Sequence, residues 1–122
     1  MKDSIYSIES KSVQDDGCCY RIGLDAGHAV YRVHFPQHPV TPGVCLLEIG
    51  VELLADALGR DLELSKACGV KFLRTLRPED SPAKVRIHNV EDGEDLVKAQ
   101  VEVSTSAAII ARMSLICRTA AK

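Results

Sequence analysis

The sequence of 122 residues contains no tryptophan, and aromatic side chains make up only 4% of it. It also lacks an excess of either charge, because fifteen basic residues against seventeen acidic ones leave a formal net charge of −2. Nucleic-acid binding relies on clustered positive charge, for which such a balance gives no general case. We therefore expect no DNA or RNA partner.

Long apolar runs are missing as well. No segment approaches the roughly 18 consecutive apolar residues of a membrane-spanning helix. The first ten residues, MKDSIYSIES, contain an acid at position 3 and have no apolar core typical of a signal peptide. The sequence therefore predicts a cytoplasmic protein without membrane contact.

The cysteines are odd in number and include no CxxC pair. Neither a disulfide framework nor a zinc ribbon is indicated by such spacing. We expect reduced and mostly buried thiols. The residues concerned are Cys18, Cys19, Cys45, Cys68 and Cys117.

The chain has an ordinary globular composition, 46% apolar and 26% charged, and its length suits one domain over residues 1–122. A helical period from Thr41 to about Leu58 ends at Gly59, a natural stop. Lys11 to Gly17 reads as a polar turn and Val30 to Val33 as a short extended lead. Strands are predicted at residues 5–8, 19–24, 64–76, 83–90, 96–105 and 107–118. An antiparallel sheet wrapped along one long helix is the α+β layering that this order supports.

Residues 34–48, HFPQHPVTPGVCLLE, place a histidine on a loop before this helix. Three prolines in the stretch fix their own φ angles and stiffen the loop. Thr41 is a suitable N-cap and Pro42 a suitable first helical residue. The first free N–H groups of the helix, including that of Gly43, point back toward His34, and this end of a helix suits a developing oxyanion.

Glu48 falls at the edge of the apolar stripe that we expect this helix to bury. A semi-buried carboxyl group there could retain a proton near neutral pH and act as an acid, whereas Glu52 points toward the rim. With His34 it would supply the groups needed for proton abstraction beside a carbonyl. The alternative is that both are ordinary surface residues. The stripe consists of Val44, Leu47, Val51, Leu54, Ala55 and Leu58.

The order HFP, then PV, then PGV, then a glutamate fourteen residues after the histidine resembles the active-site motif of the 3-hydroxyacyl-[acyl-carrier-protein] dehydratases of bacterial type II fatty acid synthesis. Phe72, Arg74, Pro78 and Asp80 give a weaker match to the family's strand F-K-R-P-x-x-P-G-D. The resemblance covers about residues 31–80. It implies the hotdog fold, in which an antiparallel sheet of about six strands wraps around one long helix.

The resemblance also implies roles for particular residues. His34 would remove the C2 proton, and Glu48 would bind or protonate the departing 3-hydroxyl group. Gly43 would donate its N–H to the thioester oxygen, and the carbonyl of Val40 would hold the other ring nitrogen of His34. His34 and Glu48 would come from different protomers of a homodimer, with further assembly left open. The substrate would be carried by an acyl carrier protein, with no cofactor and no metal.

The chain departs from the family pattern at Gln37, where glycine is usual, and at Glu52, where glutamine is usual. Both changes bear on substrate fit and chain length. Two other functions stay open: an acyl thioesterase of hotdog fold, and a non-catalytic acyl-binding subunit that pairs with an active homologue. A metal site of His34, His38, Cys45 and Glu48 is not expected, because the spacing matches no common ligand pattern and Cys45 should project away from Glu48.

Other residues could extend the site. Leu46, Leu47, Val51 and Phe72 could line an acyl tunnel, although such apolar positions are more often plain core. A basic run over residues 66–86, including Lys71, Arg74 and Arg77, could steer an acidic carrier protein toward the site. The alternative for this run is a solvated strand surface.

Overall fold

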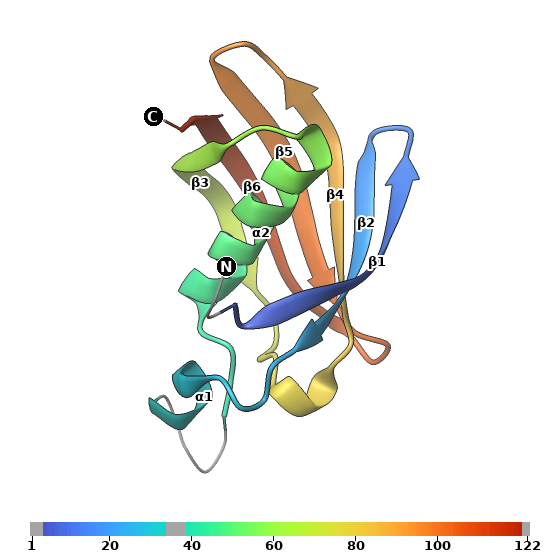
Figure 1. Cartoon of the computed structure of the whole chain (residues 1–122), viewed down its shortest axis with the longest axis vertical. Helices are drawn as coiled ribbons and strands as arrows, with labels where there is room; N and C mark the ends of the chain where they lie inside the picture. The colour runs from blue at the N-terminus through green and yellow to red at the C-terminus, as the bar shows by residue number, and fades with distance from the viewer. Residues whose placement is uncertain (1–3, 34–38, 121–122) are drawn as a thin grey trace.

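The structure, a computed structural model, describes residues 4–33 and 39–120. Within these ranges one antiparallel sheet has the strand order β1-β2-β4-β5-β6-β3, and it wraps around the long helix α2 (Figure 1). The strands are β1 (Tyr6–Gln14), β2 (Gly17–Leu24), β3 (Leu62–Phe72), β4 (Ala83–Asp92), β5 (Leu96–Ser104) and β6 (Ile109–Thr119). The helices are α1 (Ala29–Val33), α2 (Gly43–Leu58) and the 3-10 turn η1 (Pro78–Asp80). The predicted layering of one sheet around one long helix is confirmed.

The core lies between α2 and the concave face of the sheet. Alternate residues of the central strands point toward the helix, as the period of two predicts. Their inward side chains are almost completely buried: Val85 and Ile87 on β4, Val97, Ala99, Val101 and Val103 on β5, and Ala111, Met113, Leu115 and Cys117 on β6. The sheet therefore presents its outward positions to solvent and its inward positions to one helix.

The buried face of α2 differs from the predicted stripe. Leu46, Ile49, Gly50, Leu53 and Leu54 are buried, whereas Val44 is 62% exposed and Leu47 and Val51 are only half-buried. The helix is apolar on more than one side, so periodicity alone does not select the inner face. Gly50 provides the reason, because a β-carbon built there would lie 3.2 Å from Leu115 Cδ1, and its absence allows the helix close to the sheet.

The segment before α2 also differs from its prediction. Residues Ala29–Val33 form the short helix α1, and the extended lead expected there is wrong. The hydroxyl groups of Tyr31 and Thr41 lie 2.8 Å apart in the interior. Thr41 therefore does not cap α2, which begins at Gly43 with Pro42 as its N-cap residue. The predicted stop at Gly59 is confirmed, with φ of 63°.

The predicted turn from Lys11 to Gly17 is too long. Strand β1 runs on to Gln14 because it pairs with β2, with Ser12 opposite Cys19 and Gln14 opposite Gly17. Only Asp15 and Asp16 remain as the turn. Pairing partners that are not visible in a local polar pattern decide this boundary.

All five cysteines lie in the described ranges and are free, as predicted, with Cys18 and Cys117 buried and the others half-buried. No helix in the described ranges combines the length and the apolar character needed to cross a membrane.

Candidate active site

His34, Gln37 and His38 lie outside the described residues. The proposed base and its loop therefore stay predictions. Val40, whose carbonyl group the resemblance assigns to His34, is half-buried in the segment that leads into α2. Gly43 and Glu48 are both described.

The start of α2 presents free backbone N–H groups. The N–H groups of Cys45 and Leu46 donate to the carbonyl oxygen of Pro42 at 3.0 and 3.3 Å, which closes the first turn. Gly43, as the first helical residue, has an N–H without an intrahelical acceptor. The positive end of the helix dipole adds to it, so this end can stabilise negative charge on an oxygen atom.

The aromatic ring of Phe72 lies over Gly43. A β-carbon built on Gly43 would lie 2.8 Å from Cζ of Phe72, a separation that real side chains do not adopt. Phe72 itself is 51% exposed at the end of β3. The ring therefore borders the helix start, where a thioester oxygen would bind in the predicted site.

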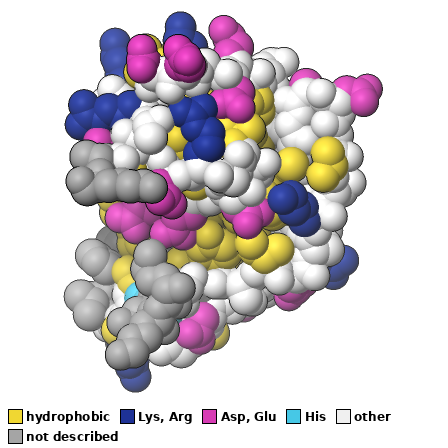
Figure 2. Space-filling model, turned by 45° about the horizontal axis from the view of Figure 1, so that its top comes forward, with side chains coloured by type: hydrophobic (Ala, Val, Ile, Leu, Met, Phe, Trp, Pro, Cys, Tyr) yellow, Lys and Arg dark blue, Asp and Glu magenta, His cyan; other side chains and the backbone are white. Residues whose placement is uncertain are grey.

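Glu48 is exposed, and the expectation of a semi-buried carboxyl group is wrong for the single chain. The reason is the rotation of α2 described above, which turns this side of the helix away from the sheet. Glu48 borders two hollows, one of about 110 Å³ and one of about 390 Å³. Figure 2 shows acidic side chains next to exposed apolar surface on one face of the molecule.

The smaller hollow brings several polar groups together. It is lined by Ser4, Ile5, Tyr6, His28, Val30, Cys45, Glu48, Ile49 and Glu52. Burial, and then the charge of Glu48, raise the pKa of the Cys45 thiol. The expectation that Cys45 projects away from Glu48 is therefore wrong, because residues three apart on a helix are neighbours.

Glu52 is half-buried, and the expectation that it lies at the rim is wrong. Its Oε1 accepts a hydrogen bond of 2.8 Å from the hydroxyl group of Tyr6. Burial, and then this hydrogen bond, raise the pKa of the Tyr6 phenol. Sequence reasoning missed Tyr6, because the two residues are 46 positions apart and no local pattern joins β1 to α2.

The larger hollow is an apolar groove between α2 and β3. It is lined by Val44, Leu47, Glu48, Val51, Glu52, Leu62 and Leu64. Leu47 and Val51, two of the predicted tunnel residues, therefore lie in a groove that is open in the single chain. Leu46, a third, is buried in the core. Strand β3 is the last strand of the sheet, so one of its edges is unpaired within the chain.

The basic run over residues 66–86 is divided by the sheet. Lys66 and Lys71 lie on β3, whereas Lys84 and Arg86 lie on β4, with β5 and β6 between them. The run is therefore not one patch. Lys71 stands opposite Arg112 of β6 and, like Arg74, is exposed.

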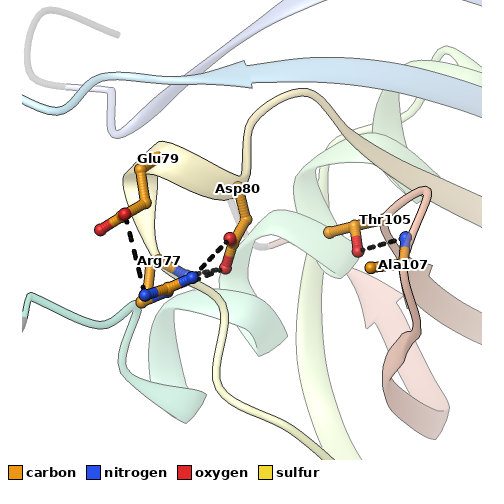
Figure 3. A network of polar contacts seen from close by, with 5 residues as sticks. All are labelled: Arg77, Glu79, Asp80, Thr105 and Ala107. Carbon is orange, nitrogen blue, oxygen red and sulfur yellow. Dashed lines mark hydrogen bonds and ion pairs between the residues drawn. The ribbon is translucent and has the colours of Figure 1, made fainter.

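Arg77 is also exposed, but neighbouring carboxylates engage its charge. Its Nη2 lies 3.2 Å from Asp80 Oδ1 and its Nη1 lies 3.7 Å from Glu79 Oε2 (Figure 3). On the far side of Figure 3, the N–H of Ala107 donates to Thr105 Oγ1 at 3.2 Å. Of the predicted docking residues, Lys71 and Arg74 are the more available to a partner.

Metal ligands were also considered. Within residues 4–33 and 39–120, no group of three or more His, Cys, Asp or Glu side chains is placed to hold a metal ion. The alternative site of His34, His38, Cys45 and Glu48 includes two residues outside these ranges.

Comparison with known proteins gives matches to dehydratases. Residues 10–109 match the family model described as ApeI-like, ApeI dehydratase. The sequence is 32% identical over 104 residues to the 3-hydroxyacyl-[acyl-carrier-protein] dehydratase FabZ of Latilactobacillus sakei subsp. sakei (strain 23K), which covers 79% of this chain and 74% of that protein.

Two solved structures share the fold. The dehydratase heterocomplex ApeI:P from Xenorhabdus doucetiae superposes with a TM-score of 0.70 at 18% identity, over 92% of this chain and 97% of that one. A hypothetical thioesterase from Streptococcus pneumoniae TIGR4, solved with coenzyme A, gives 0.66 at 10% identity, over 96% and 87%. Such identities show the fold alone, and the predicted hotdog fold is confirmed.

Proposed function

The chain belongs to the ApeI-like dehydratase family, and we propose that it removes water from a 3-hydroxyacyl thioester to give the trans-2-enoyl thioester. The observation that carries this proposal is the arrangement on α2. A free N–H at Gly43 and the carboxyl group of Glu48 lie on one helix, beside an open apolar groove. The segment matched by the family includes both residues and His34.

In the proposed reaction, the N–H of Gly43 donates to the thioester oxygen and stabilises the enolate-like state, a contribution typically worth about 3 kcal/mol for one such donor. His34 takes the C2 proton, while the carbonyl of Val40 orients its ring. Glu48 gives a proton to the 3-hydroxyl group. The C2–H and C3–O bonds break, a C2–C3 double bond forms, and the hydroxyl group leaves as water.

A second copy of the chain completes the site in this proposal. The unpaired edge of β3 offers backbone hydrogen bonds to another strand. Val44 and Leu64, 62% and 38% exposed, place apolar surface next to that edge. A copy docked there would cover the groove and bring His34 of the partner subunit toward Glu48. The homodimer is therefore the proposed working form.

The proposed substrate is carried by an acyl carrier protein, as the name of the Latilactobacillus relative specifies for that enzyme. Lys71 and Arg74 are exposed and could attract an acidic carrier, since complementary charge mainly speeds encounter. The predicted cytoplasmic location belongs to this proposal. We propose no cofactor.

Two alternatives have support from the structural neighbours. Acyl thioester hydrolysis fits a fold that a hypothetical thioesterase shares. A non-catalytic subunit fits a fold that occurs in a dehydratase heterocomplex. The presence of Gly43, Glu48 and His34 together favours the active dehydratase over both.

Product analysis tests the proposal. The purified protein is incubated with a 3-hydroxyacyl thioester on a carrier protein or on coenzyme A, and separately with an unsubstituted acyl thioester. We expect enoyl thioester from the first substrate and no free thiol from the second. His34→Ala and Glu48→Gln should each lower turnover by about 10²- to 10⁴-fold, whereas His88→Gln, a change on β4 of the sheet, should not.

Other outcomes would favour the alternatives. Free thiol from the unsubstituted substrate, with no enoyl product, would favour the hydrolase. Turnover that appears only after mixing with a homologous hotdog chain would favour the non-catalytic subunit.

A further inference from the structure

Glu48 and Glu52 lie one turn apart on α2, and both border the same two hollows. The β-carbons of residues four apart on a helix are about 5–6 Å from each other. Two carboxyl groups at this separation repel when both are ionised. When only one proton is available, their surroundings decide which of them carries it.

Those surroundings differ. Oε1 of Glu52 accepts the hydrogen bond from Tyr6, a donor that keeps its proton because burial and then Glu52 raise the pKa of the phenol. A hydrogen bond of this kind stabilises the ionised form of the carboxyl group that accepts it. Residues 4–33 and 39–120 provide no such donor to Glu48. Glu52 is therefore the better site for the negative charge.

We infer that Tyr6 and Glu52 form a positioning pair, in which Tyr6 fixes a negative charge on Glu52 and that charge keeps the proton on Glu48. The use of that proton rests on the proposed function, because the dehydration needs an acid at Glu48. The pair itself does not depend on it. Closure of the groove by a partner or a substrate would exclude water and strengthen the coupling between the two carboxyl groups.

Other titratable groups face the same hollow. Cys45 adds little charge, since burial, and then Glu48, raise the pKa of its thiol. His28, whose Nδ1 accepts a hydrogen bond of 3.1 Å from the N–H of Val30, can carry a positive charge that would act against Glu52. Asp56, one turn beyond Glu52, is engaged by the Tyr20 hydroxyl at 2.6 Å and by Lys11 at 3.3 Å. It lies too far along the helix to affect Glu48 strongly.

The test variant is Glu52→Gln, which keeps an oxygen for Tyr6 to bond and removes the charge. In the full-length protein, ¹³C NMR of the side-chain carboxyl carbons reports the titration of each glutamate. We expect the midpoint of Glu48 to fall by about half to one pH unit in the variant. In turnover, the loss of kcat/KM toward alkaline pH should begin at a correspondingly lower pH, which makes the variant about three- to tenfold slower on that side.

Matched variants separate this role from a merely structural one. Asp56→Asn removes another acid of α2 and should leave the titration of Glu48 and the pH profile unchanged. Tyr6→Phe alone should lower the plateau of activity by about twofold, because the proton is then shared between the two carboxyl groups. Adding Tyr6→Phe to Glu52→Gln should cause no further shift. His28→Gln measures the opposing charge.

The outcomes are distinct. Identical titration of Glu48 in the wild type and in Glu52→Gln overturns the inference, as does an equal shift in Asp56→Asn. If the wild type does not dehydrate 3-hydroxyacyl thioesters, the proposed function fails, and the NMR titration still decides whether the pair exists.

Discussion

The ring of Phe72 packs against the α-carbon of Gly43, so closely that a β-carbon there would lie 2.8 Å from Cζ of the ring. The contact joins the end of β3 to the first residue of α2. It explains why a glycine stands at the helix start, where other residues are better helix formers. Any side chain must displace either the ring or the backbone N–H.

Gly43→Ala should therefore lower kcat/KM by about 10- to 100-fold, since misplacing one oxyanion donor costs on this order. Thermal unfolding should change little, because alanine favours the helix. Gly43→Ala combined with Phe72→Ala relieves the clash and should recover part of the activity. A double variant as slow as the single one would show that the ring is not the cause.

Mixed dimers test whether the site is shared. His34→Ala and Glu48→Gln should each be inactive alone, but a dimer with one copy of each contains one site with both residues intact. Equal mixing with free exchange should restore about a quarter of wild-type activity. Size-exclusion chromatography with light scattering checks that dimers form. No recovery after exchange would place both residues within one protomer.

Charge reversal tests carrier docking. Lys71→Glu with Arg74→Glu should raise KM for a carrier-bound substrate by about fivefold or more and spare the coenzyme A thioester. Arg77→Glu should have less effect on KM, because Asp80 and Glu79 already engage that charge. Steady-state kinetics at low and high salt measure both. Equal effects on the two substrates would exclude docking at these residues.

The hydrogen bond from Tyr20 to Asp56 ties β2 to α2, and it lowers the pKa of the Asp56 carboxyl group. Tyr20→Phe should cost about 1–2 kcal/mol of unfolding free energy at pH 7, at the lower end for a bond to a charged group because Asp56 is 46% exposed. A lowered folded-state pKa stabilises above the unfolded value of about 3.9, and this is lost as pH falls through the folded value.

The difference between wild type and Tyr20→Phe should therefore narrow below about pH 4, as urea unfolding at pH 7 and pH 3 would measure. Part of it should remain, because the same hydroxyl group also donates to the carbonyl of Leu53 at 3.2 Å. Lys11→Gln, which removes only an exposed ion pair with Asp56, should cost less than about 1 kcal/mol. A difference that is constant with pH would contradict the role of Asp56.

The order of strands and helix could be read from the sequence because the patterns are local. Four strands after the helix alternate along β3 to β6, and Gly59 marks the end of α2 through its own backbone preference. The family was visible for the same reason, since the spacing from His34 to Glu48 lies within one short stretch. The segment 29–33 was misread because five residues are too few for a period to distinguish helix from strand.

What the tertiary structure decided is how α2 is turned about its axis. An apolar helix can bury more than one of its sides, and only packing of Gly50 against Leu115 selects the inner one. That choice exposes Glu48 and opens the groove beside β3, neither of which a local pattern contains. The bond between Tyr6 and Glu52 is likewise a product of folding, because burial brings together two groups that lie 46 residues apart.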